Sequence, residues 1–212
     1  MSSFVILLGG SLTMTDRLRR QCGGAQLIAA DSGMRHAALF DRGADLWVGD
    51  FDSTDNELAA RFGDVPRERH DPDKAKTDGE LAVDAALARG ATSLVLAGAL
   101  GGERTDHAVY HATLTMSLAE RGIDVIASSG EEELWPLVPG TRRFDFPAGT
   151  RFSVIGLSDI AGLTLDGVRW PLDEAAIPFG SSRTLSNIVT GTLSVNMTLG
   201  KAFILAHPAA AQ

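Results

Sequence analysis

The sequence contains a single cysteine, Cys22, among its 212 residues. One cysteine excludes an internal disulfide bond and any metal site built from several thiolates, and it suits the reducing cytoplasm, where we expect the protein to work. The start of the chain has no basic segment, and its apolar run over residues 4–8 is short. We therefore expect neither a signal peptide nor a membrane-spanning segment.

Positive charge is also scarce, with 19 lysines and arginines against 27 aspartates and glutamates, which gives a net charge of −8. A chain with this balance is a poor non-specific binder of nucleic acids or anionic membranes, so we expect neither as a partner. A local basic patch that holds phosphate groups is still compatible with this charge.

Several catalytic motifs are missing. The sequence has no P-loop, no dinucleotide-binding glycine pattern and no serine in a nucleophile elbow, and its five histidines lack zinc-ligand spacing. His107 and His111 are four residues apart without the accompanying glutamate pattern, and we expect His111 on the surface of a helix. Nucleophilic catalysis by the protein itself therefore finds little support.

The first half of the chain alternates apolar runs with segments of helical spacing. Strands are predicted at residues 4–8, 27–30, 44–48, 93–97 and 124–127, and helices at residues 34–41, 56–62, 78–89 and 108–121. This alternation predicts an α/β domain whose mostly parallel sheet is flanked by helices on both faces.

After about residue 129 the pattern changes to short apolar runs separated by glycine, proline, aspartate and asparagine. The runs lie at residues 131–138, 144–146, 152–155, 163–165, 168–170, 193–197 and 202–205. Closely spaced short strands with turn signals predict an all-β antiparallel sandwich. We expect two domains, residues 1–129 and 130–212.

Residues 49–53 read Gly-Asp-Phe-Asp-Ser and follow a predicted strand. In an extended segment, Asp50 and Asp52 would point to the same side, while Phe51 would turn back into the core. Two carboxylates so placed repel each other unless a cation lies between them, and hard oxygen ligands suit Mg²⁺. The alternative is an ordinary acidic turn.

Polar loops follow four of the predicted strands, at residues 9–11, 31–33, 49–53 and 101–107. Because ligands bind beyond the carboxyl ends of parallel strands, we expect these loops to gather at one edge of the sheet. This coincidence favours the metal interpretation of Asp50 and Asp52.

Residues 71–78 carry charges of both signs and precede a predicted helix. Asp78 can supply a third carboxylate to the metal, while Lys74 and Lys76 meet phosphate oxygens. The structural alternative, which is compatible with the first, is that Thr77 caps the helix and Glu80 completes a capping box. The lysines would then be solvated surface residues.

Residues 98–107 follow a strand and open a helix. Gly101 and Gly102 let backbone N–H groups approach an anion, the helix start favours negative charge, and Arg104 adds a fork of donors. These features predict a phosphate site. The alternatives are that Asp106 is a helix N-cap and that His107 is a surface histidine.

Together these stretches resemble the thiamine pyrophosphokinase family. The resemblance rests on residues 30–33, 49–53, 76–80, 101–107, 167–172 and 184–187, in this order, over nearly the whole chain. It implies an α/β nucleotide-binding domain followed by a β-sandwich, and transfer of pyrophosphate from ATP to the hydroxyl of thiamine, giving thiamine diphosphate and AMP. It also implies a homodimer whose thiamine sites lie between one subunit's first domain and the other's second.

The resemblance implies roles for individual residues. It matches three carboxylates to the family's Mg²⁺ ligands, seven residues to ATP binding and five to thiamine binding. The metal ligands are Asp50, Asp52 and Asp78; the ATP-binding residues are Asp31, Gly33, Lys76, Thr77, Gly101, Gly102 and Arg104; the thiamine-binding residues are Asp106, His107, Trp170, Ser186 and Asn187. Asp106 is the candidate for orienting the thiamine hydroxyl or accepting its proton. A tryptophan buried in the sandwich is an equally good interpretation of Trp170.

Three positions depart from the family pattern. Ala75 stands where the family usually has an aspartate, Ser32 replaces a glycine, and Glu103 lengthens the phosphate loop by one residue. Two other functions stay open. One is a pyrophosphokinase of the same fold acting on another hydroxymethyl heterocycle, such as a pterin. The other, which Ala75 makes credible, is a nucleotide- or thiamine-binding protein without catalysis.

Overall fold

The structure is a computed structural model that describes residues 2–51, 56–71 and 75–208. The chain divides into two compact units: Met1–Leu114 with Arg121–Gly130, and Thr115–Glu120 with Glu131–Gln212. Across the described residues, no helix is long and apolar enough to cross a membrane.

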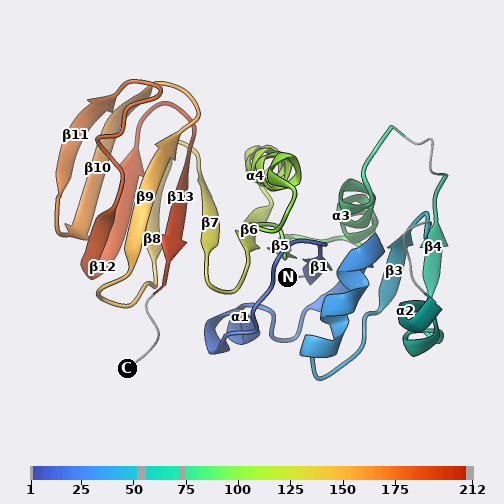
Figure 1. Cartoon of the computed structure of the whole chain (residues 1–212). Helices are drawn as coiled ribbons and strands as arrows, with labels where there is room; N and C mark the ends of the chain where they lie inside the picture. Colours follow the sequence, from blue (N-terminus) through green and yellow to red (C-terminus); the bar gives the residue numbers. More distant parts are fainter. Residues whose placement is uncertain (1, 52–55, 72–74, 209–212) are drawn as a thin grey trace. The chain divides into compact units, whose positions relative to one another are not determined.

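The first unit is built on a parallel sheet with the strand order β6-β5-β1-β2-β3-β4 (Figure 1). Every neighbouring pair in it is parallel. Its strands are β1 (Ser3–Leu7), β2 (Gln26–Ala30), β3 (Leu46–Gly49), β4 (Arg67–Arg69), β5 (Ser93–Ala97) and β6 (Asp124–Ser128). The predicted α/β fold is confirmed, although β4 is not among the predicted strands.

The helices of this unit cover both faces of the sheet, with α3 and α4 on one face and α1 and η1 on the other (Figure 1). They are α1 (Asp16–Gln21), the 3₁₀ helix η1 (Asp31–Leu39), α2 (Asn56–Arg61), α3 (Asp78–Ala88) and α4 (Thr105–Glu120), of which Thr115–Glu120 belongs to the second unit. The sequence predicts α2 and α3 to within one residue and misses α1. The helix predicted at residues 34–41 begins three residues earlier and has 3₁₀ geometry.

The direction of strand addition reverses beside β1. The chain adds β2, β3 and β4 on one side of β1, and α3 then returns it to β5 and β6 on the other side. In open α/β sheets, such a reversal leaves a crevice beyond the carboxyl ends of the two central strands, where ligands bind. The loops that follow β1 and β5 flank this crevice.

In the second unit, every strand pair among the described residues is antiparallel; the strand order is β7-β13-β9-β12-β10-β11, with β8 paired to β12. Its strands are β7 (Glu133–Leu137), β8 (Gly140–Phe144), β9 (Arg151–Gly156), β10 (Ile160–Val168), β11 (Leu172–Ile177), β12 (Asn187–Met197) and β13 (Ala202–His207). The start of β12 pairs with β9 and its end pairs with β8, so the sheet folds back on itself. The predicted antiparallel β domain is confirmed.

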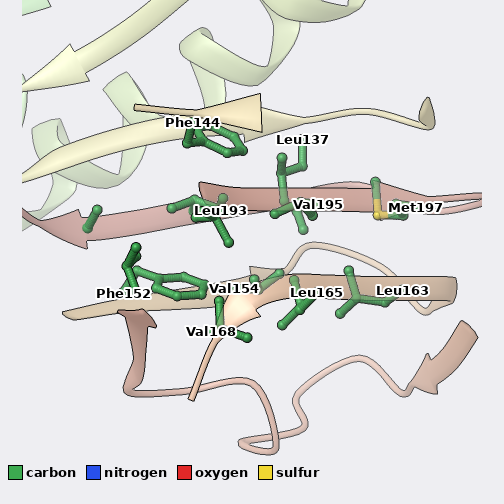
Figure 2. Close-up of a cluster of buried hydrophobic side chains, with 14 of the residues drawn as sticks. Leu137, Phe144, Phe152, Val154, Leu163, Leu165, Val168, Leu193, Val195 and Met197 are labelled. Atoms are coloured by element: carbon green, nitrogen blue, oxygen red, sulfur yellow. The ribbon is translucent and has the colours of Figure 1, made fainter. Parts of the chain in front are cut away.

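The core of this unit is mainly apolar, although polar side chains such as those of Thr184 and Asn187 are also buried. Figure 2 shows Phe144 of β8, Phe152 of β9, Leu165 of β10 and Leu193 of β12 within one buried cluster. Burial of each such side chain stabilises the fold by roughly 1.5–3 kcal/mol. The two short runs expected at residues 163–165 and 168–170 are wrong as separate strands, because β10 runs through Gly167 without a break.

Candidate functional site

A cavity of about 560 Å³ opens in the first unit, at the point where the strand order reverses. It is walled by the loop after β1, the loop after β5, η1 and α4. The lining residues are Gly9, Gly10, Ser11, Ser32, Arg35, Gly98, Ala99, Gly101, Gly102, Glu103, Arg104, His107, Ala108 and His111. The volume lies in the range of small-molecule sites. Three of the four polar loops that we expect at this edge, at residues 9–11, 31–33 and 101–107, contribute to the lining, whereas residues 49–51 do not.

The floor of the cavity consists of backbone because the two loops touch. The N–H of Gly10 donates to the carbonyl of Gly98 at 2.9 Å. A Cβ atom on Gly10 would lie only 2.4 Å from that carbonyl oxygen, so no other residue fits here. A floor without side chains allows an anion to approach the backbone N–H groups closely.

Two arginines line the cavity. Arg104 donates from Nε to Oδ1 of Asp106 at 2.9 Å and from Nη2 to Oδ2 at 2.6 Å. These two hydrogen bonds hold the pKa of the Asp106 carboxyl well below its usual range and raise the pKa of Arg104. Arg35 donates to the carbonyl of Gly9 and, at 3.4 Å, to that of Gly10. The cavity therefore combines cationic side chains with a polar backbone floor, which suits an anionic ligand.

Two buried histidines support the loops. His36 donates through Nε2 to the carbonyl of Gly10 at 2.9 Å, and His111 through Nδ1 to that of Ala99 at 3.1 Å. Burial lowers the pKa of both imidazoles, so both are neutral at pH 7. The expectation that His111 lies on a helix surface is wrong, because α4 turns this side chain towards the loop and leaves it 6% exposed.

Sequence reasoning misses Arg35 and His36 as parts of this site. Their only sequence signal is their place in the helical segment after the loop at residues 31–33. Gly101, Gly102, Arg104 and His107, which the sequence does predict, all line the cavity.

Two family models match the chain. Residues 24–127 match "Thiamin pyrophosphokinase, catalytic domain", and residues 142–201 match "Thiamin pyrophosphokinase, vitamin B1 binding domain". The two matches follow the order of the two units and together cover well over half of the chain. The chain belongs to the thiamin pyrophosphokinase family.

Individual relatives agree with this assignment. The thiamine pyrophosphokinase of Bacillus subtilis is 29% identical to this chain over 143 residues. The aligned stretch covers 66% of this chain and 66% of the relative, which is just under two thirds of the relative's length. A crystal structure of the Bacillus subtilis protein superposes with a TM-score of 0.86 at 22% identity, over 99% of this chain and 100% of that one. The thiamin pyrophosphokinase of Geobacillus thermodenitrificans gives a TM-score of 0.82 at 25% identity, over 100% and 99% of the two chains.

Two of the three predicted metal ligands, Asp50 and Asp78, lie among the residues that the structure describes. Asp50 directly follows β3 and is partly buried, and Asp78 lies in the first turn of α3, whose start packs on Leu8 beyond β1. Asp52 lies outside the described residues, as does Lys74. Within the described ranges, no three His, Cys, Asp or Glu residues form a group that could hold a metal ion. The donor chemistry of Asp50 and Asp78 fits Mg²⁺, which prefers carboxylate oxygens.

The backbone at Phe51 differs from the extended geometry that the sequence argument assumes. The β3 strand ends at Gly49, and Phe51 has a left-handed backbone with φ of 65°. The alternation that would point Asp50 and Asp52 to one side therefore does not hold through Phe51. The Phe51 ring does turn inward and packs edge-on against Trp47, with 5.1 Å between ring centroids.

Asp31 and Gly33, predicted to bind ATP, begin η1 just after β2. Asp31 is partly buried, and its backbone is left-handed with φ of 42°. Gly33 is buried, and a Cβ atom there would lie 2.1 Å from the carbonyl oxygen of Leu7. Gly33 thus lets η1 pack tightly on β1, and its role in ATP binding stays a prediction.

Lys76 and Thr77 lie at the start of α3. Thr77 is the N-cap, accepting from the backbone N–H of Glu80 at 3.2 Å, as the structural interpretation expects. Lys76 pairs with Asp84 at 2.6 Å and with Glu80 at 3.2 Å, and the Asp84 hydrogen bond is the main cause of its raised pKa. Tyr110 donates to the other carboxylate oxygen of Glu80. The Lys76 ammonium group must break its ion pairs with Asp84 and Glu80 before it can bind a phosphate group.

The second unit has a small hollow of about 220 Å³ that two of the three thiamine-binding candidates of the second half line, and Ser186 is not among its lining residues. Trp170 and Asn187 line it. Trp170 is 52% exposed, so its interpretation as a buried sandwich tryptophan is wrong. Ser186 is exposed and has φ of 60°, while Asn187 is buried.

Asn187 uses its side-chain amide within the protein. Its Nδ2 donates to the carbonyl of Trp170 at 2.8 Å, and its Oδ1 accepts from the N–H groups of Trp170 and Ile188 at 3.2 and 2.8 Å. These bonds join the segment after β10 to the start of β12. Asn187 therefore fixes the backbone that carries the exposed Trp170 ring.

Proposed function

We propose that this protein transfers pyrophosphate from ATP to the hydroxyl of thiamine, giving thiamine diphosphate and AMP. The observation that carries the proposal is the cavity at the switch point, whose backbone floor and arginines suit a polyphosphate. The match of the chain to both domain models of the family supports it. On this proposal, residues 1–129 bind ATP and residues 130–212 bind thiamine.

The reaction is a displacement at the β-phosphorus of ATP. A bond forms between the thiamine oxygen and that phosphorus, the bond from the phosphorus to the bridging oxygen of the α-phosphate breaks, and AMP leaves. The hydroxyl proton passes to solvent or to a base. Catalysis of such a transfer depends on alignment and on neutralising the charge of the phosphate oxygens.

The chain's own residues divide this work. The loop backbone at Gly101 and Gly102 and the guanidinium of Arg104 bind the triphosphate, with Asp31, Gly33, Lys76 and Thr77 assigned to ATP. Asp50, Asp52 and Asp78 would hold Mg²⁺, which when bound neutralises charge on the phosphate oxygens.

Asp106 orients the thiamine hydroxyl. Because Arg104 holds its pKa low, the carboxylate is a weak base, and orientation is the better-supported of its two predicted roles. His107 lies one residue further along α4 and lines the cavity, and we assign it to the thiamine side of the site.

Trp170, Ser186 and Asn187 form the second part of the thiamine site, with Asn187 acting through the Trp170 backbone. We propose a homodimer in which the first domain of one subunit meets the second domain of the other. At a thiamine concentration far below KM, where each parent variant is slow, mixing Asp50→Asn subunits with Ser186→Ala subunits should then restore part of the activity, because each mixed dimer holds one intact site. Inactive mixtures would contradict the shared site.

We place the reaction in the cytoplasm. The support for this placement is that a chain with a single cysteine suits a reducing compartment. Burial of Cys22 raises the pKa of its thiol to about 12, so the thiol is unreactive.

The test is to incubate the purified protein with ATP, MgCl₂ and thiamine and to quantify the products by chromatography. We expect equimolar AMP and thiamine diphosphate. ADP as the sole nucleotide product would contradict the proposal. Asp50→Asn should lower turnover by roughly 10²–10³, since charge stabilisation is often the largest catalytic contribution.

The same assay separates the rival functions. A hydroxymethyl pterin offered in place of thiamine tests the substrate class, and faster turnover of the pterin would favour that rival. Tight calorimetric binding of ATP and thiamine without any product would identify a binding protein.

A further inference from the structure

Two non-glycine residues with left-handed backbones follow neighbouring strands of the first unit. Asp31, with φ of 42°, comes directly after β2, and Phe51, with φ of 65°, comes two residues after β3. This conformation is uncommon for residues with a side chain and persists only where the surroundings enforce it. Each of these turns carries a carboxylate of the proposed site, Asp31 in one and Asp50 in the other.

The indole of Trp47 contacts both turns. Trp47 lies on β3, opposite Ala29 of β2, and is fully buried. Its Nε1–H donates to the backbone carbonyl of Asp31 at 2.9 Å. Its ring meets the Phe51 ring edge to face, with an interplanar angle of 79°. One rigid side chain therefore bonds to the first turn and packs against the second.

Two arginines of β4 hold the aromatic pair. The guanidinium of Arg67 lies 4.8 Å from the centroid of a Trp47 ring and 5.4 Å from that of Phe51. Arg69 lies 5.7 Å from the Phe51 centroid. Cations at these distances from ring centroids are attracted by the π electrons. The Phe51 ring is thus fixed by Trp47 and by both arginines.

We propose that Trp47 is a positioning residue that sets the two carboxylate-bearing turns relative to each other. Its N–H holds the backbone of Asp31, on the nucleotide side, and its ring holds Phe51 and so fixes the direction of Asp50, on the metal side. This inference rests on the proposed function for the roles of Asp31 and Asp50. The contacts predict that loss of the N–H donor to Asp31 and loss of the ring contact with Phe51 have separate effects on ligand binding.

Two substitutions separate them. Trp47→Phe keeps a ring against Phe51 but removes the N–H donor to Asp31. Phe51→Leu keeps the hydrogen bond between Trp47 and Asp31 but removes the ring contact. Trp135→Phe is the matched control, because the Trp135 indole donates to Glu133, packs edge-on against Phe144 and lies under Arg142, all in the second unit.

Three measurements read out the effects: calorimetric binding of ATP in EDTA, stabilisation against thermal unfolding by MgCl₂ with ATP, and the MgCl₂ concentration for half-maximal activity. Trp47→Phe should weaken metal-free ATP binding by roughly three- to tenfold, the effect of one lost hydrogen bond, with little change in the MgCl₂ requirement. Phe51→Leu should raise the MgCl₂ requirement and leave metal-free ATP binding nearly unchanged. Trp135→Phe should change neither.

Equal effects of Trp47→Phe and Phe51→Leu on both ligands, or no effect in either folded variant, would overturn the inference. If either variant fails to fold, a protein that keeps Trp47 as its sole tryptophan, with Trp135→Phe and Trp170→Phe, gives a second test. Its fluorescence should change when ATP is added, and an unchanged spectrum at saturating ATP would overturn the inference. Wild-type turnover decides the proposed function separately, since the binding measurements need no catalysis.

Discussion

Arg104 and Asp106 form a two-point ion pair at the start of α4, with donor–acceptor distances of 2.9 and 2.6 Å. Both side chains are exposed, and the pair stands at the edge of the cavity that Arg104 lines. The hydrogen bonds from Arg104 are the main cause of the lowered pKa of Asp106. A carboxylate held this way can orient a hydroxyl but accepts a proton poorly.

Asp106→Asn should therefore lose less activity than the removal of a general base would cost. An amide still accepts a hydrogen bond from the thiamine hydroxyl, so we expect kcat/KM to fall by roughly tenfold and the acid side of the pH–rate profile to keep its shape. Removal of a general base usually costs about 10²–10⁴. A loss of that size, together with a lost acid limb, would assign the proton transfer to Asp106.

The buried histidines predict a pH-dependent stability. Burial lowers the pKa of His36 and His111 in the folded state, each from an ordinary value of 6.5, so below that pH the unfolded chain binds more protons than the folded one. The free energy of unfolding should fall as the pH decreases below about 6.5, and this loss should continue until the pH passes the lowered folded-state values.

Urea unfolding at a series of pH values measures this dependence. The double variant His36→Gln, His111→Gln should lose most of the slope between pH 6.5 and pH 5, although it is less stable at pH 7. A variant with an unchanged slope would show that other groups cause the acid sensitivity.

The Thr77 cap predicts a local contribution to stability. Thr77→Ala removes the acceptor for the N–H of Glu80, and the loss of such an N-cap costs about 1 kcal/mol. Thr113→Ala is a matched control, since the Thr113 hydroxyl donates to the carbonyl of Tyr110 within α4, a bond that helps a helix little. Equal denaturant midpoints for the two variants would argue against the cap.

Ser186 and Asn187 should differ sharply despite being neighbours. Asn187→Ala leaves two backbone N–H groups and a carbonyl without their partner, so we expect a loss of roughly 2–4 kcal/mol in unfolding free energy. Ser186 is exposed, so Ser186→Ala should leave stability within about 0.5 kcal/mol and raise the KM for thiamine. Equal stability of the two variants would contradict the structural role of Asn187.

Strands with an apolar signal are predicted well, and those without one are missed. The β5 strand is predicted to the residue because Ser93–Ala97 is an uninterrupted run with a buried face. The β4 strand is Arg-Glu-Arg and has no apolar residue; it exists because its backbone pairs with β3 and Arg67 covers Trp47. The β11 strand, with acidic Asp173 and Glu174, is missed for a similar reason.

In the candidate site, too, residues with a local sequence signal are predicted and residues without one are missed. Gly101, Gly102 and Arg104 are predicted because glycines and a cation before a helix have a local meaning. Arg35 and His36 are missed because their roles come from contacts with the loop after β1, which no local pattern records. The extended geometry assumed through Phe51 fails because its backbone is left-handed, and the contacts of its ring with Trp47, Arg67 and Arg69 are not recorded in any local pattern.

The fate of the β-phosphorus of ATP tests the central claim most directly. The protein would be given thiamine, MgCl₂ and ATP that carries radioactive phosphorus only at the β position, and the products would be separated by chromatography. We predict that the label appears in thiamine diphosphate, in the same amount as unlabelled AMP, because the hydroxyl attacks the β-phosphorus. Label that is found in ADP, with none in the thiamine product, would contradict pyrophosphate transfer.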